Sequence, residues 1–189
     1  MAKSKRNVLT HGLSGTMGDL MVFRQLNGET IVANFPKERT APLTEKQKQA
    51  LARFKKATVY GKSVKGNEEL RAMYQAKVKS GQTAYLLAVT DYLTSPVVED
   101  ADLRAYKGVI GDKIKVNALD DFQVKSVAVS ITSAADELIE EGNAVQNPMN
   151  DLEWTYTVKV SNATLAGTKV SFTASDLPGN GTILTSIIS

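Results

Sequence analysis

The chain has 189 residues, of which 42% are hydrophobic and 23% are charged, with a formal net charge of +3 and no cysteine. These values are typical of one or two globular domains, and they exclude disulfides, thiolate nucleophiles and most structural zinc sites. No run of about 18 apolar residues is present, so a membrane span is not expected. The basic N-terminus, "MAKSKRNVLTHGLSG", has no apolar stretch behind it, and we expect no signal peptide.

The charge is distributed unevenly along the chain. Residues 1–105 contain 17 Lys and Arg against 10 Asp and Glu, a net +7, whereas residues 106–189 contain 6 against 10, a net −4. This asymmetry predicts two parts that face different surroundings, the basic part meeting nucleic acid or an acidic protein surface and the acidic part facing solvent. A chance pairing of lysine-rich helices with an acidic sandwich is the competing explanation.

Two alternating segments near the N-terminus predict a β-hairpin. Residues 1–11 are polar and basic and are expected to form a flexible arm. Across residues 17–35, "MVFRQ" and "ETIVANF" flank Asn27-Gly28, which favours the type I′ turn that joins antiparallel strands most tightly. Because an isolated two-stranded hairpin is only marginally stable in water, we expect this one to pack on its own helices, on a neighbouring copy or on a partner.

Three helices are predicted after the hairpin. The first follows a proline-containing linker over residues 36–43 and begins at Thr44, where "TEKQ" matches a capping box. Gly61 is expected to weaken this helix or to end it early. The second helix covers about residues 68–79. The third covers about residues 83–93 and should be the buried one, because it is apolar on most faces.

From Tyr106 onward the hydrophobic period falls to two, which is typical of strands. Six or seven short segments at intervals of roughly ten residues, separated by turn residues, predict an antiparallel β-sandwich. The segments are "KIKVNAL", "QVKSVAVSITS", "ELIEEGNAVQ", "LEWTYTVKV", "TKVSFTASDL" and "TILTSII". Two sets of apolar residues should form the facing inner surfaces: Val127, Val129 and Ile131, and Trp154, Tyr156 and Val158.

The predicted fold class is therefore α+β, with an N-terminal β-hairpin and about three helices followed by a C-terminal antiparallel β-sandwich. The change in pattern and charge predicts two domains. A basic docking domain, made of the hairpin and the helices, would cover residues 1–100, and the sandwich would cover residues 101–189.

No segment matches a nucleotide-binding or catalytic motif in its required context. "KATVYGKS" (residues 56–63) ends like a P-loop, but Lys56 stands where the first glycine is needed and the segment continues a helix. "GLSGTMG" has no βαβ unit around it and is better interpreted as a flexible turn. His11, the only histidine, has no cysteine or carboxylate pair beside it, which argues against a zinc site or a catalytic triad.

Two of the carboxylates suggest a metal site, although turn chemistry explains them more simply. Asp120 and Asp121 are expected in a sandwich turn, where added backbone carbonyls would make a Ca²⁺ site. Turn chemistry explains the same residues, because Asp side chains bond to their own backbone. The other carboxylates lack an identifiable apolar pocket that would shift a pKa for acid–base work. They are Glu99, Asp100, Asp102, Glu140, Glu141 and Asp176.

The lysine-rich face of the first predicted helix is the best candidate for contact with nucleic acid. Phe23, Tyr60 and Tyr74 would be available to stack on bases, although they also fall at packing positions. A lysine-rich stripe is more often a solvated face. The basic residues are Lys46, Lys48, Arg53, Lys55, Lys56, Lys62 and Lys65.

The hairpin carries more large apolar side chains than so small an element is able to cover by itself. The three helices or another chain must therefore cover them, and we expect the hairpin to act as a docking element. The residues concerned are Met17, Leu20, Met21, Phe23 and Ile31.

Residues 15–58, "GTMGDLMVFRQLNGETIVANFPKERTAPLTEKQKQALARFKKAT", resemble a recurrent N-terminal pattern of small uncharacterised virion structural proteins of tailed phages and prophages. The pattern is G-x-x-G-x-x-x-V-F-R-x-x-x-G-x-x-I-V, then a proline, then T-x-x-Q-x-x-x-R-x-x-F, and Arg53 lies later than it requires, next to Phe54. "YKGVIGDKIKVNALDDFQVKSVAVSI" and "ASDLPGNGT" are similar to bacterial and phage immunoglobulin-like domains. The matched residues are Gly15, Gly18, Val22, Phe23, Arg24, Gly28, Pro36, Thr44, Gln47 and Phe54.

The resemblance implies a non-enzymatic phage virion structural protein, such as a capsid decoration or a head–tail ring component, which assembles in the host cytoplasm with other virion proteins and as a homo-oligomer. No catalytic residue, metal or cofactor is assigned. Two alternative functions remain from the residues themselves. The protein would be a nucleic-acid-binding virion or genome-associated protein, or an adhesion module. The residues predicted to dock on the partner are Met21, Phe23, Arg24, Ile31, Arg53 and Phe54.

Overall fold

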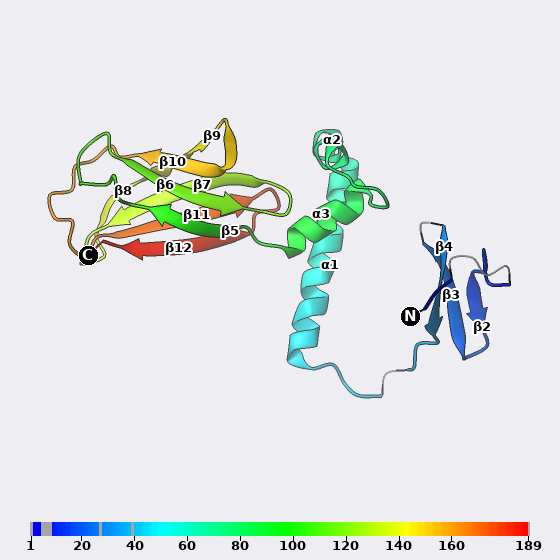
Figure 1. The fold of residues 1–189 in the computed structure, drawn as a ribbon. Helices are drawn as coiled ribbons and strands as arrows, with labels where there is room; N and C mark the ends of the chain where they lie inside the picture. The colour runs from blue at the N-terminus through cyan, green and yellow to red at the C-terminus, as the bar shows by residue number, and fades with distance from the viewer. Residues whose placement is uncertain (1, 5–8, 27, 39, 189) are drawn as a thin grey trace. The chain divides into compact units, whose positions relative to one another are not determined.

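The computed structural model of the chain describes residues 2–4, 9–26, 28–38 and 40–188 (Figure 1). Within these residues the fold is α+β, as predicted, with three helices and three antiparallel sheets of four strands each.

Contacts divide the chain into two compact units, Met1–Ala50 and Leu51–Ser189, which we call the N-terminal unit and the C-terminal unit. The C-terminal unit contains most of the helical residues together with two of the sheets. The domain boundary between residues 100 and 101 was predicted from sequence pattern and charge. It is a statement about which segments fold independently, and it stays a prediction.

The N-terminal unit contains one sheet, with the strand order β1-β4-β3-β2. Leu26 pairs with Glu29, so the loop between β3 and β4 has two residues, as the Asn-Gly sequence predicts. Gly28 has a φ of 78°, the left-handed conformation that such a turn requires, while Asn27 lies outside the described residues. The strands are β1 (Ala2–Ser4), β2 (Gly15–Met17), β3 (Met21–Leu26) and β4 (Glu29–Asn34).

The predicted flexible arm is wrong for Ala2–Ser4, which form strand β1. This strand pairs antiparallel with β4, with Ala2 opposite Val32 and Ser4 opposite Thr30. A three-residue polar edge strand has no alternation to detect, and the backbone hydrogen bonds offered by its neighbour decide its conformation.

Helix α1 (Glu45–Gly66) begins where the sequence predicts. The Thr44 amide donates to the Gln47 side chain at 3.1 Å, and the Gln47 amide donates to the Thr44 hydroxyl at 3.4 Å. These two bonds form the expected capping box.

The sequence predicts that Gly61 weakens α1 or ends it early; the early end is wrong, because the helix continues to Gly66. It is buried against α3 (Ala84–Leu93), where an added Cβ would lie 2.7 Å from Val89 Cγ2 and 2.9 Å from the Tyr85 ring. The missing side chain therefore permits the close approach of the two helices.

The shorter helices α2 (Glu68–Ala76) and α3 start at side-chain caps. Asn67 accepts a bond from the amide three residues on at 3.1 Å, and Thr83 does the same at 3.2 Å. Helix α3 is less buried than its apolar sequence suggests, because only one of its sides is covered. That side carries Ala84, Ala88, Val89 and Asp91, whereas Leu86 is 48% exposed.

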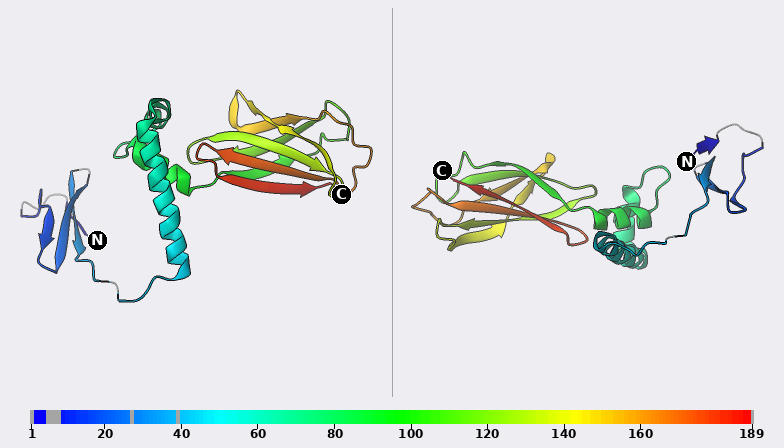
Figure 2. Two further views of the ribbon diagram at one scale, coloured as in Figure 1. Left: turned by 180° about the vertical axis from the view of Figure 1, so that it is seen from behind. Right: turned by 90° about the horizontal axis from the view of Figure 1, so that it is seen from below.

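The two sheets of the C-terminal unit pack face to face (Figure 2). Their strand orders are β5-β6-β10-β9 and β12-β11-β7-β8. Buried side chains from both sheets form one cluster, which contains both of the inner surfaces predicted from alternation, so that prediction is confirmed. The strands are β5 (Val97–Asp102), β6 (Lys113–Leu119), β7 (Val124–Thr132), β8 (Leu138–Asn143), β9 (Val145–Asn147), β10 (Asn150–Thr157), β11 (Lys169–Asp176) and β12 (Gly181–Ile187).

Strand β5 was not predicted. It is an edge strand with a single fully buried residue, Val98, and its pairing with β6 shifts register after Glu99. Asp100 has a φ of 51°, which breaks the strand's alternation. An acidic edge strand of this kind carries too little hydrophobic pattern to be recognised.

The helices contact one end of the sandwich, and we call this contact the junction. Tyr74 stacks on Phe122 with ring centroids 4.2 Å apart. The Lys77 ammonium donates to the Phe122 carbonyl at 2.8 Å. The Asn180 side-chain amide donates to two backbone carbonyls at the end of α3, at 3.2 and 3.1 Å. The sandwich thus holds the helices through its β6–β7 and β11–β12 connections.

Among the described residues, no helix has the length and apolar character needed to cross a membrane.

Candidate functional site

The N-terminal sheet carries apolar side chains on both of its faces. Alternation along β3 places Met21 and Phe23 on one face and Val22 and Arg24 on the other. On the first face Met17 of β2 lies opposite Met21, and Val32 of β4 lies opposite Phe23. On the second face Ile31 lies opposite Arg24 and Ala33 opposite Val22.

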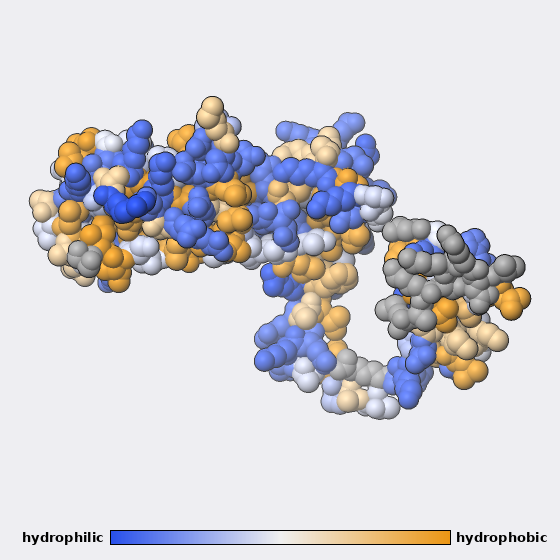
Figure 3. All heavy atoms as spheres, in the orientation of Figure 1, coloured by the Kyte–Doolittle hydropathy of each residue, from blue (hydrophilic) through white to orange (hydrophobic). Residues whose placement is uncertain are grey.

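This sheet has no hydrophobic core of its own. Among residues 9–26, 28–38 and 40–50 of the N-terminal unit only Thr30 is buried, and it is held by polar contacts. Its hydroxyl accepts bonds from the Gly12 amide at 3.1 Å and the Gln25 side-chain amide at 2.8 Å. By contrast, Met17 is 59% and Leu20 71% exposed, and apolar side chains of the unit are open at the surface in Figure 3.

The six predicted docking residues lie in two elements. Met21, Phe23, Arg24 and Ile31 belong to the N-terminal sheet, where Arg24 and Ile31 form a cross-strand pair and Phe23 occupies the opposite face. Arg53 and Phe54 belong to α1 in the C-terminal unit.

The first half of α1 is exposed on all sides. Every residue from 45 to 56 is exposed, including Leu51 at 54% and Phe54 at 51%. The Arg53 guanidinium donates to the Leu93 carbonyl at 3.0 Å, which ties this part of the helix to the end of α3. Leu51 and Phe54 are three residues apart and so share one side of the helix.

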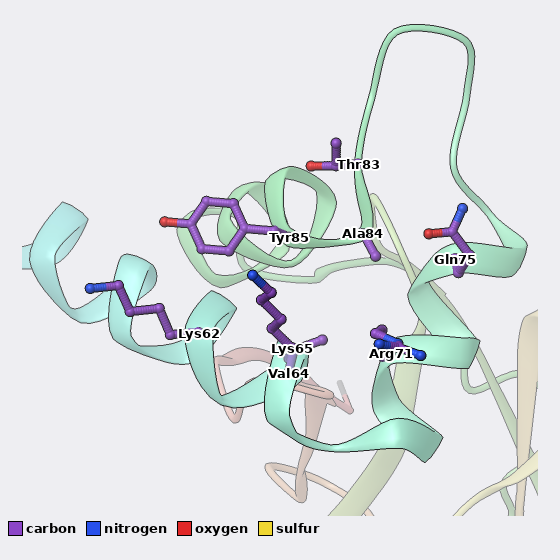
Figure 4. Close-up of a pocket in the computed structure, with 8 residues that line it drawn as sticks. All are labelled: Lys62, Val64, Lys65, Arg71, Gln75, Thr83, Ala84 and Tyr85. Atoms are coloured by element: carbon purple, nitrogen blue, oxygen red, sulfur yellow. The ribbon is translucent and has the colours of Figure 1, made fainter.

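A cavity of about 570 Å³ lies among the three helices (Figure 4). Lys62 and Lys65 line it from α1, and Arg71 lines it from α2, beside an apolar wall that includes Val64 and the Tyr85 ring. None of these three cations takes part in an ion pair among the described residues. Cations beside an apolar wall suit a small molecule that carries an anionic group.

The residues considered for other activities fall into structural roles. Tyr74 is fully buried and its hydroxyl lies 2.9 Å from that of Tyr60, so both pack in the junction and Tyr74 is unable to stack on a base. Residues 56–63, which end like a P-loop, lie inside α1, where the backbone amides are used by the helix. His11 is exposed.

The junction also brings together three carboxylates, Asp91, Asp120 and Asp176. One oxygen of each lies within 4.8 Å of the others, and Asp91 and Asp176 are at most 1% exposed. Burial raises the pKa of Asp91 to about 7, and the charges of Asp120 and Asp176 act in the same direction, against the hydrogen bond from the Tyr74 hydroxyl.

Sequence reasoning considered Asp120 and Asp176 separately and missed Asp91. A signal was available, because Asp91 is the only charged residue in the apolar segment "AYLLAVTDYL" and lies seven residues after Ala84, on the same side of the helix. Asp121, which was paired with Asp120 in the Ca²⁺ hypothesis, is exposed and is not part of the group.

Comparisons of the chain with protein-family models, with curated protein sequences and with solved structures found no match. The function must therefore be argued from the sites themselves.

Proposed function

We propose that this protein is a non-enzymatic structural component of a phage particle, which docks on the main shell protein through its N-terminal sheet. The observation that carries the proposal is that no hydrophobic residue among residues 9–26, 28–38 and 40–50 of the N-terminal unit is buried, although the sheet carries apolar side chains on both faces.

The physical argument concerns the stability of a single-layer sheet. A sheet gains stability when at least one apolar face is removed from water, at roughly 25 cal/mol for each Å² of apolar surface. Here Met17, Leu20, Met21 and Leu26 are each 38–71% exposed. An apolar patch of this kind on a protein surface marks an interaction site, and a partner that covers it would supply the missing layer.

The exposed start of α1 supports a second docking element besides the sheet. An isolated helical segment of about twelve residues is marginal in water, so a fully exposed one gains little from its own chain. Leu51 and Phe54 would add apolar anchors, and the surrounding lysines and Arg53 would meet acidic groups of the partner.

We also propose that the sandwich is an immunoglobulin-like domain that projects from the particle or bridges neighbouring subunits. Its strand orders support this assignment, because β5-β6-β10-β9 corresponds to strands A-B-E-D and β12-β11-β7-β8 to strands G-F-C-C′ of that fold. Two features depart from antibody domains. The chain has no cysteine for the inter-sheet disulfide, and Trp154 lies on β10, in the position of strand E.

The assignment to a phage particle is supported by the resemblance of residues 15–58 to virion structural proteins. The basic charge of residues 1–105 and the acidic charge of residues 106–189 suit a chain with one end on an assembly and the other in solvent.

Mass spectrometry of purified virions tests the proposal directly. The protein should be present in a fixed ratio to the shell protein. Virions that contain no trace of it would reject a structural role.

Variants test which surface docks. Phe23→Asp and Ile31→Asp place a charge on each face of the sheet in turn, and at least one should lower incorporation into particles about tenfold or more, because burying an unpaired charge at an interface is costly. Met149→Asp is the matched control, since Met149 is 96% exposed on the sandwich. Equal incorporation of all three variants would contradict docking through the sheet.

A second function, binding of nucleic acid, is favoured by one observation. All seven basic residues of the lysine-rich face of α1 are exposed, and Lys55 and Lys56 line an open cavity of about 600 Å³ with Tyr60 and Tyr92. A filter-binding titration decides between the two, because phosphate contacts predict a steep fall in affinity with rising salt. No binding at low salt would exclude this function.

A third function, adhesion to a host surface through the sandwich, is supported only by analogy with other domains of this fold.

A further inference from the structure

The carboxylates of Asp91, Asp120 and Asp176 come from three separate elements of the C-terminal unit. Asp91 lies on α3, Asp120 in the connection after β6, and Asp176 at the end of β11. One oxygen of each lies within 4.8 Å of the other two. The fold therefore concentrates three acidic groups at the point where the helices meet the sandwich.

Neighbouring donors satisfy only part of this group. Both oxygens of Asp176 have donors and keep lone pairs for a further ligand, because Oδ1 accepts the Gly179 and Asn180 amides at 2.7 and 2.6 Å and Oδ2 accepts the Asn180 side chain at 2.6 Å. Asp120 Oδ2 accepts the Gln123 amide at 2.9 Å. Asp91 Oδ2 accepts the Tyr74 hydroxyl.

Two carboxylate oxygens are left over. Asp91 Oδ1 and Asp120 Oδ1 are both buried and have no hydrogen-bond partner among the described residues. Asp91 as a whole is only 1% exposed. A buried acceptor without a partner costs about 1–3 kcal/mol, and more when it is charged. Native structures tolerate such a group mainly where a ligand, an ion or a proton completes it.

No protein cation neutralises the three carboxylates. The ion pairs among the described residues do not include them. Lys77 lines the same cavity as Asp120, but its ammonium donates to the Phe122 carbonyl and lies 4.5 Å from the centre of the Phe122 ring. The other titratable groups at the site are the hydroxyls of Tyr60 and Tyr74, whose pKa values burial raises further, so they remain neutral donors.

We propose that Asp91, Asp120 and Asp176 form a binding site for a hard divalent cation, with Ca²⁺ as the best fit. The ligand atoms are all carboxylate oxygens, which suit Ca²⁺ and Mg²⁺. Ca²⁺ holds oxygens at about 2.3–2.6 Å, so two ligands on opposite sides of the ion are about 4.6–5.2 Å apart. Oxygens within 4.8 Å of one another are close enough to share either ion, and Ca²⁺ is favoured because it accepts irregular arrangements of six to eight oxygens, whereas Mg²⁺ demands a near-ideal octahedron.

Asp120 is the most exposed of the three carboxylate residues, although its Oδ1 is itself buried. This residue also lines a cavity of about 240 Å³ together with Lys77, Gln146 and Asp151. The cavity offers an entry path, and Asp151 adds a fourth carboxylate along it. A bound ion keeps water molecules as further ligands in such an opening.

The ion would act as a clamp between the helices and the sandwich. One ligand comes from α3 and two come from sandwich connections, so the ion holds the same elements together as the Tyr74–Phe122 stack and the Asn180 bonds. This inference does not depend on the proposed docking function, because none of the three residues lies in the N-terminal unit.

Thermal unfolding of the full chain, freed of metal with a chelator, tests the proposal. Adding CaCl₂ to about ten times the Kd should raise the Tm by about 3–6 °C, and the Tm should keep rising with the logarithm of the Ca²⁺ concentration, since a ligand of the native state stabilises it by mass action. MgCl₂ at the same concentration should raise it less. Isothermal titration calorimetry should give one Ca²⁺ for each chain.

Three variants locate the site. Asp91→Asn and Asp120→Asn should abolish the Ca²⁺-dependent rise in Tm, whereas Asp121→Asn, which changes the exposed neighbour, should keep it. If Asp91→Asn does not fold, Asp120→Asn, at the less buried residue, gives the same answer.

The proposal fails if Ca²⁺ at millimolar concentration changes neither the Tm nor the heat of titration. In that outcome, a higher Tm of metal-free Asp91→Asn would indicate that the carboxylates share a proton instead. A Ca²⁺ response that survives both variants, or that is lost equally in Asp121→Asn, would also overturn it.

Discussion

The N-terminal sheet and the sandwich use the same building element with opposite results. Each sheet has four antiparallel strands with alternating apolar residues. In the sandwich two such sheets share one cluster of buried side chains that includes Ile114, Phe172 and Tyr156. In strands β2, β3 and β4 of the N-terminal sheet the described apolar residues stay partly or largely exposed and only Thr30 is buried. The difference shows that strand pairing and alternation make a sheet, while a second layer makes a core.

Hydrogen exchange should separate the two regions most strongly. Amides of β7 and β11 should exchange about a thousandfold or more slowly than those of β3 and β4 in the isolated protein, because the former open only when the core unfolds. Hydrogen exchange with mass spectrometry measures both in one sample. Equal protection of β3 and β4 would show that the chain covers its own N-terminal sheet, and the comparison would fail.

A pair of phenylalanine truncations sharpens the comparison. Phe172 is completely buried in the sandwich, so Phe172→Ala should lower the free energy of unfolding by about 3–5 kcal/mol. Phe23 is half-buried in the N-terminal sheet, and Phe23→Ala should cost about 1 kcal/mol or less in the isolated protein. Urea unfolding followed by circular dichroism gives both values. A loss of similar size in the two variants would mean that Phe23 belongs to a core.

Gly61 offers a smaller test within the C-terminal unit. Gly61→Ala should be destabilising by about 1–3 kcal/mol, because its Cβ would lie 2.7 Å from Val89 Cγ2, and this overlap outweighs the gain of about 1 kcal/mol in helix propensity. Gly66→Ala is the matched control, since a Cβ there meets nothing within 4 Å. Thermal unfolding of both variants is sufficient. A Gly61→Ala protein as stable as Gly66→Ala would refute the close contact of α1 and α3.

The smallest effect concerns pH. Hydrogen bonds that the backbone amides of Val109 and Lys107 donate to the Asp112 carboxylate hold its pKa below the usual range. The folded state therefore binds this proton less readily than the unfolded state, so the stabilisation is present above about pH 4 and is lost as the pH falls through the folded pKa. Asp112→Asn should lower the Tm at pH 7 by less than about 3 °C and remove this component of the acid sensitivity. Asp121→Asn should change neither, and a full acid response in Asp112→Asn would contradict the assignment.

How much of the molecule the sequence predicts depends on whether a feature is local. The Thr44 capping box, the Asn-Gly hairpin and strand β6 were predicted because each depends on neighbouring residues or on a strict period of two. Strand β1 was missed because it exists only through pairing with β4. Gly61 was misjudged because its role depends on Val89, 28 positions further along the chain in sequence numbering.

The candidate sites follow the same rule. The excess of apolar residues in the hairpin is a property of composition, and the exposure of Met17 and Leu20 agrees with it. The junction carboxylates were not predictable as a group, because Asp91, Asp120 and Asp176 meet only after the helices have packed on the sandwich. The three residues are far apart in the sequence, so no local pattern indicates the site that they form in the folded protein.

The hydrogen bonds of the Asn180 side chain indicate which turn of the sandwich tolerates an inserted sequence poorly. Its side chain joins the β11–β12 turn to the end of α3, so a peptide inserted in that turn would pull on a helix as well as on two strands. The turn at Met149, between β9 and β10, has a 96% exposed side chain at its tip. An epitope tag or a fluorophore attachment site placed at Met149 should therefore leave the Asn180 bonds intact and report on the cavity that the flanking residues Gln146 and Asp151 line with Asp120.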